Sequence, residues 1–185
     1  MMDCKKALVE ADGDVAQATE WLRVKGLASA DKKGSRATKE GLIETYVHTG
    51  GKLGVMVEVN CETDFVSKGD DFKELVKMLA MQIAACPDVE YVKAEDISEE
   101  ARAAERAIEL KNEDLAGKPD AIKEKMVEGR LNKMFKEKIL LEQKYIKDDT
   151  MTVDDFVASY VARLGENIQV ARFYTFRLGE MQVEA

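Results

Sequence analysis

The sequence predicts an α+β protein in which a small antiparallel three-stranded sheet has helices packed on one side. Two segments that alternate apolar and polar residues flank a pair of glycines, which is the pattern of a β-hairpin. A third segment, residues 167–178, is rich in β-branched and aromatic residues and indicates another strand. Between them, apolar residues recur at helical spacing, so helices are expected to cover the sheet.

The composition argues against two classes of protein, those that bind nucleic acid and those that associate with membranes. The chain has 185 residues, of which 45% are hydrophobic and 35% charged, a profile typical of folded soluble proteins. The formal net charge of −8 argues against direct binding to nucleic acid, because the phosphate backbone repels an acidic protein. Since there is no run of about 18 apolar residues, we expect no membrane partner, and the charged start does not resemble a secretory signal.

The chain begins with two predicted helices. Asp12-Gly13 should separate them, Asp14 can cap the second with Gln17 three residues later, and Gly26 should end it. The apolar face of the first helix consists of Cys4, Ala7, Leu8 and Ala11. We therefore expect a helical module at residues 1–27, a polar linker at 28–40 and a core domain at 41–185.

The core domain should open with the hairpin. Leu42 to His48 can form its first strand. The turn is Thr49 to Lys52, whose glycines adopt positive φ at little cost. The second strand alternates cleanly and has one apolar face, made of Leu53, Val55, Val57 and Val59.

Four further helices are expected within the core domain. Pro87 should end the first, and Ser98 should cap the second, which is so charged that it should be largely exposed. Thr152 should cap the last helix and Gly165 should end it. The approximate ranges are residues 72–83, 98–114, 122–134 and 153–164.

The three cysteines, Cys4, Cys61 and Cys86, are isolated and form no CxxC pair. The sequence therefore indicates no metal site, cofactor or redox centre, and an odd cysteine count fits a reducing compartment. A cysteine enzyme would have to pair a thiol, such as that of Cys61, with the only histidine, His48. Nothing around either residue resembles a catalytic elbow, so we expect no enzyme and no catalytic residue.

The segment after the second strand, residues 60–69, is predicted to be a loop, and its composition is unusual. It places Phe65 and Val66 between a polar run and Gly69. One interpretation is that both side chains are buried beneath the sheet as core. The other is that Phe65 projects into a pocket of a partner protein, oriented by Asp64.

Three strings carry a family resemblance. MMDCKKAL at residues 1–8, EVNCETDFV at 58–66 and EKMVEGR at 124–130 resemble the elongation factor Ts family. The hairpin and the final strand resemble it as well, so the likeness covers essentially the whole chain.

The resemblance implies a guanine nucleotide exchange factor for the translational GTPase elongation factor Tu, in the bacterial cytoplasm or an organelle matrix or stroma. In this family a short segment intrudes beside the magnesium and phosphate site of the GTPase and promotes GDP release. The matching residues here are Thr63, Asp64, Phe65 and Val66. The N-terminal module is expected to be ubiquitin-associated-like and to dock on the GTPase domain through Met2, Asp3, Lys5 and Lys6.

Two departures from the family pattern matter. The family has a first helix and a TGAG-like turn before MMDCKKAL, so we expect an incomplete N-terminal module. The sheet subdomain occurs once, as in short family members, which implies a homodimer. The alternative function is a ubiquitin-associated-type adaptor that binds proteins without exchange activity.

Overall fold

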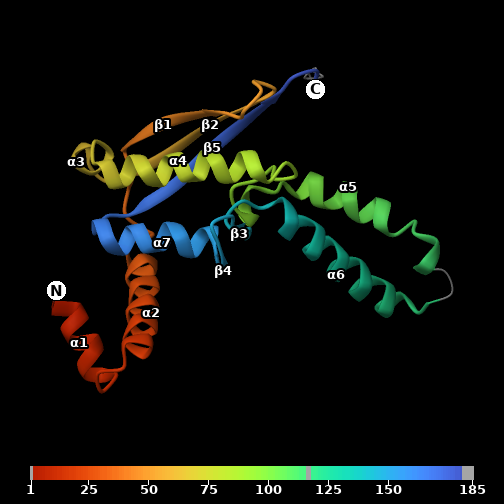
Figure 1. The fold of residues 1–185 in the computed structure, drawn as a ribbon. Helices are drawn as coiled ribbons and strands as arrows, with labels where there is room; N and C mark the ends of the chain where they lie inside the picture. Colours follow the sequence, from red (N-terminus) through yellow and green to blue (C-terminus); the bar gives the residue numbers. More distant parts are fainter. Residues whose placement is uncertain (1, 116–117, 181–185) are drawn as a thin grey trace. The chain divides into compact units, whose positions relative to one another are not determined.

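The computed structural model describes residues 2–115 and 118–180 (Figure 1). The chain forms two compact units, of which the first is Met1–Ala84 with Asp154–Ala185 and the second is Ala85–Val153. The helices and antiparallel strands confirm the predicted α+β class.

The first unit contains the predicted sheet. Its elements are α1 (Met2–Glu10), α2 (Val15–Lys33), β1 (Glu40–Val47), β2 (Leu53–Cys61), α3 (Asp64–Ser67), α4 (Asp70–Ala85), α7 (Val153–Leu164) and β5 (Ile168–Arg177). The strand order is β1-β2-β5, with β2 antiparallel to both neighbours. The predicted turn is confirmed, because Gly50 and Gly51 have φ values of 96° and 67°.

One face of the sheet is buried and the other is open. Val55, Val57 and Val59 of β2 are buried, as their alternation predicts. Helices α4 and α7 lie on one side of the sheet (Figure 1), as predicted. The buried side chains of α4 follow the helical period and include Phe72, Leu75, Val76, Leu79 and Ile83.

The two N-terminal helices pack around small residues. Asp12 and Gly13 have positive φ and turn the chain between α1 and α2. The Asp14 carboxylate caps α2 by accepting from the Gln17 amide at 3.0 Å, as predicted. Ala7, Ala11 and Ala18 are buried, with Trp21 and Leu22 packed against them.

The predicted end of the second helix at Gly26 is wrong, because α2 continues to Lys33. An added Cβ at Gly26 would lie 3.4 Å from the Ala162 Cβ, so the glycine lies where α2 approaches α7 closely. The Lys33 ammonium then reaches the Val161 carbonyl at 3.4 Å. These contacts with α7 favour a continuous helix, and only residues 34–39 connect α2 to β1. The division into module, linker and core domain stays a prediction.

The second unit is built on a pair of helices. Its elements are the 3-10 turns η1 (Ala94–Asp96) and η2 (Glu113–Leu115), helices α5 (Glu99–Glu109) and α6 (Asp120–Lys138), and strands β3 (Lys144–Tyr145) and β4 (Asp148–Thr152). Ser98 caps α5 as predicted, and α5 buries none of its residues, although it ends at Glu109, before the expected Asp114.

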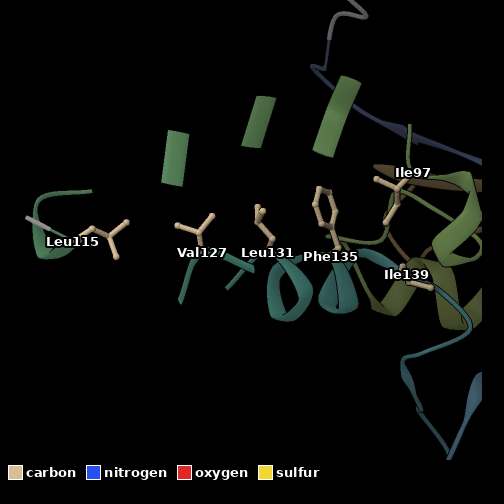
Figure 2. Packing of buried hydrophobic residues seen from close by; sticks show 6 residues of the cluster. All are labelled: Ile97, Leu115, Val127, Leu131, Phe135 and Ile139. Atoms are coloured by element: carbon tan, nitrogen blue, oxygen red, sulfur yellow. The ribbon is translucent and has the colours of Figure 1, made fainter. Parts of the chain in front are cut away.

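The core of this unit lies along one face of α6. Val127, Leu131 and Phe135 are spaced by four residues and point to the same side of the helix (Figure 2). The remaining members of the cluster are Ile97, Leu115 and Ile139. The β3–β4 hairpin was not predicted, because its sequence, KYIKDDTMT, is mostly polar and lacks an apolar alternation.

Candidate functional site

The segment after β2 is a single helical turn, α3, whereas the sequence predicted a loop. Thr63 is the N-cap residue and has extended backbone angles, φ −130° and ψ 154°. The Ser67 amide then bonds the Thr63 carbonyl at 3.3 Å, and the Lys68 amide bonds the Asp64 carbonyl at 3.1 Å. The Gly69 amide returns to the Val66 carbonyl at 3.0 Å, so the turn is closed at both ends.

The turn separates the two apolar residues at its centre. Phe65 is 84% exposed, whereas Val66 is only 8% exposed. Successive residues of a helix point about 100° apart, so one turn can bury one neighbour and present the other. Val66 is therefore core, as the first interpretation expects, whereas Phe65 projects into solvent. Its entry into a partner's pocket stays a prediction.

Asp64 has a local partner that the sequence analysis missed. Its carboxylate accepts from the Lys68 ammonium at 2.6 Å, across the i, i+4 spacing of the turn. This hydrogen bond, with the charge of Lys68, lowers the pKa of Asp64. Both side chains are mostly exposed, so the pair contributes little to stability. The pair places a carboxylate and an ammonium group next to Phe65.

Thr63 is held by a distant residue. Its amide and its hydroxyl donate to the two carboxylate oxygens of Glu166, at 3.0 Å and 2.6 Å. Glu166 follows Gly165, where α7 ends. The two residues are 103 positions apart, and neither apolar periodicity nor a local motif points to such a pair.

A hollow of about 390 Å³ lies beside Phe65. The Asp71–Arg163 ion pair lines it and joins the start of α4 to the end of α7. Its lining residues are Phe65, Val66, Gly69, Asp70, Asp71, Arg163 and Leu164. The turn therefore combines a projecting aromatic side chain, an acidic neighbour and a concave surface.

The predicted residues of the N-terminal module are all exposed, and three of them lie together. Asp3 pairs instead with Lys25, whose ammonium lies 5.0 Å from the centre of the Trp21 ring. A hollow of about 330 Å³ is lined by Met2, Lys5, Lys6, Val9, Glu10 and Trp21. Trp21 and Lys25 were missed because they lie on the other helix of the pair.

The Cys61–His48 pair that a cysteine enzyme would need does not form in this fold. Cys61 is buried at one end of the hairpin, where burial raises its pKa to about 11. His48 lies beyond the opposite end of β1, about 26 Å away at roughly 3.3 Å per residue. The His48 Nδ1 instead lies 3.2 Å from the Tyr46 hydroxyl.

Within residues 2–115 and 118–180, no cluster of three or more histidine, cysteine, aspartate or glutamate side chains could hold a metal ion. Within the same ranges, every helix is too short or too polar to cross a bilayer.

Known proteins resemble this chain over nearly its whole length. Residues 14–180 match the family model described as elongation factor TS. An elongation factor Ts from a Picosynechococcus species is 61% identical over 180 residues, which is 97% of this chain and 83% of the relative. The elongation factor Ts of a Synechocystis species is 58% identical, with the same coverage of both chains. That of Gloeothece citriformis is 59% identical, and the match covers 97% of this chain but 63% of the relative. The chain therefore belongs to the elongation factor Ts family of translation elongation factors.

Proposed function

We propose that this protein is a guanine nucleotide exchange factor for elongation factor Tu and that the Thr63–Val66 turn enters the GTPase beside its magnesium and phosphate site. Family membership supports the general role. The observation that carries the proposal is the 84% exposure of Phe65 on a turn closed by hydrogen bonds. A large aromatic side chain on a rigid support is typical of the anchors that fill a partner's pocket.

Exchange of this kind requires no covalent chemistry. The factor must bind the nucleotide-free GTPase more tightly than the nucleotide-bound form, and by linkage it then weakens nucleotide binding by the same factor. Burying one phenylalanine side chain contributes on the order of 1.5–3 kcal/mol. If this contact forms only in the empty state, it weakens GDP binding roughly tenfold to a hundredfold.

Each residue of the turn has a distinct part in the proposal. Thr63 fixes the start of the turn through Glu166, and Val66 anchors its end in the core. Phe65 fills space in the partner. Asp64 brings a negative charge close to the region where the GTPase holds its magnesium ion.

The test compares Phe65→Ala with Val66→Ala. Removing the exposed ring should slow stimulated GDP release about thirtyfold, a loss of roughly 2 kcal/mol, because hot-spot contacts cost that much. Its free energy of unfolding should change by less than about 0.5 kcal/mol, as for other surface residues. Val66→Ala should instead lose about 1–3 kcal/mol of stability, because it leaves a cavity. Fluorescent GDP release and urea unfolding measure the two effects.

Ile108→Ala is the matched control for the loss of an exposed apolar side chain, because Ile108 is 62% exposed on α5. This variant should release GDP at the wild-type rate. If Phe65→Ala were strongly destabilised but retained full exchange per folded molecule, the wedge mechanism would be wrong.

The N-terminal helices supply a second contact surface in this proposal. Met2 and Trp21 line the hollow on α1 and α2, and Lys5 and Lys6 add positive charge to its edge. Such charges increase association rates by electrostatic steering. A Lys5→Glu, Lys6→Glu variant should therefore bind elongation factor Tu more slowly at low salt, and stopped-flow measurements should show the difference shrinking as salt is added. Equal association rates at low salt would argue against this surface.

A further inference from the structure

Glu62 and Glu166 hold the turn that carries Phe65. Each glutamate accepts hydrogen bonds from the residue that follows the other glutamate in the sequence. Glu166 accepts from the amide and hydroxyl of Thr63, at 3.0 Å and 2.6 Å. In return, Glu62 accepts from the Asn167 amide at 2.7 Å. The end of β2 and the start of β5 are therefore joined by a reciprocal pair of contacts, which we call the glutamate brace.

Asn167 extends the brace to the segment that follows α2. It is only 3% exposed, and its side-chain amide donates to the carbonyls of Arg36 and Gly34 at 2.8 Å and 3.3 Å. The Arg36 guanidinium also donates to Glu62 at 3.3 Å. The hydrogen bond from the backbone amide of Asn167, with a smaller contribution from Arg36, lowers the pKa of Glu62.

The turn needs this external support. Helix α3 has four residues, and a single turn is unstable by itself because helix nucleation is unfavourable. The hydroxyl of the N-cap residue, Thr63, accepts no capping bond from the turn, and it donates a hydrogen bond to Glu166. The start of the turn therefore takes its position from Glu166, and Phe65 lies only two residues further on.

We propose that Glu166 is a positioning residue for nucleotide exchange, and that the glutamate brace holds the Thr63–Val66 turn in the shape that presents Phe65. Glu166 acts through Thr63. The inference rests on the proposed function of Phe65, because it assigns Glu166 a role in the same step.

The first experiment measures GDP release from elongation factor Tu over a range of exchange-factor concentrations. Glu166→Ala should lower the maximal rate about tenfold, as expected for the loss of hydrogen bonds to a charged group. In a Phe65→Ala background the same change should cause no further loss, because there is no ring left to position. Glu166→Gln, which retains one carbonyl acceptor for the Thr63 hydroxyl, should recover part of the rate.

Glu90→Ala is the matched control. It removes a glutamate that pairs with Lys138 at 2.9 Å in the other unit, and it should leave exchange unchanged. A residue that only stabilises the fold would lower the rate equally with and without Phe65. Additive losses in the double variant, or an unchanged maximal rate in Glu166→Ala, would overturn the proposal.

The second experiment does not depend on exchange activity. Amide hydrogen exchange of the free protein, followed by NMR, should show a protected Thr63 amide, and Glu166→Ala should speed its exchange at least about tenfold. A wild-type Thr63 amide that exchanges like an exposed one would overturn the brace. Failure of the unmodified protein to stimulate GDP release would instead overturn the proposed function, and the role of Glu166 in exchange with it.

Discussion

At the scale of single residues, Phe65 and Val66 show what an amino-acid pattern can and cannot predict. Both are apolar and adjacent, so the sequence indicates only that the pair is unusual after a polar run. Which one projects depends on the rotation of a four-residue helical turn. That rotation is set by Thr63 and by contacts with residues more than 100 positions away, which no local pattern encodes.

Cys61 gives a residue-scale prediction. It is fully buried, and its raised pKa of about 11 leaves very little reactive thiolate at pH 8. Cys4 is exposed, so a fluorescent iodoacetamide should label Cys4 rapidly and Cys61 only after unfolding. Peptide mapping after partial labelling measures the order. Labelling of Cys61 as fast as Cys4 in the folded protein would contradict the buried site.

The same pKa shift makes stability depend on pH in the alkaline range. The folded state holds the Cys61 proton more tightly than the unfolded state, whose thiol has a pKa near 9.0. The contribution to stability is therefore fully present below pH 9.0 and is lost as the pH rises toward about 11. Cys61→Ser should flatten this part of a urea-unfolding profile.

At the scale of elements, apolar periodicity predicted the hairpin, the final strand and the main helices. It failed where tertiary contacts override local preference. Gly26 is a normal stop signal, yet α2 passes through it because the helix packs closely on α7 there. It also failed for the β3–β4 hairpin, whose polar residues carry no apolar alternation.

Gly26 offers a test of that close approach. Gly26→Ala places a Cβ at 3.4 Å from the Ala162 Cβ, which is ordinary contact, and alanine favours the helix by about 1 kcal/mol. We expect the thermal midpoint to rise. Gly26→Leu should lower it, because the longer side chain must push α2 away from α7. A stabilising leucine would show that the two helices do not pack closely.

At the scale of the whole molecule, the open face of the sheet in the first unit carries apolar side chains that the proposed function leaves unexplained. The register places five exposed apolar side chains on that face, namely Ile43, Val47, Met56, Tyr174 and Phe176. The Glu58–Arg172 ion pair, at 2.7 Å, lies among them. Apolar patches of this kind often mark protein interfaces, so this face is our candidate surface for the expected homodimer.

Sedimentation velocity tests this assembly. The wild-type protein should sediment as a dimer at tens of micromolar, because this concentration is above a dissociation constant of about 1 μM. Tyr174→Glu should yield monomers, because a charge would be buried at the centre of the face. Ile108→Glu, on the exposed helix α5, should stay dimeric. A monomeric wild-type protein under these conditions would rule out the homodimer.

The second unit is inserted into the chain of the first unit, between β2 and β5. The chain leaves the first unit at Ala84 and returns at Asp154. Inside the second unit the outgoing and returning segments run side by side, since the Leu140 and Leu141 amides donate to the Tyr91 and Val92 carbonyls. An insertion whose outgoing and returning segments are paired can be gained, lost or exchanged as one cassette during evolution, without a change in the β1-β2-β5 order. The helical pair can therefore diverge by itself, while the turn bearing Phe65 stays part of the first unit.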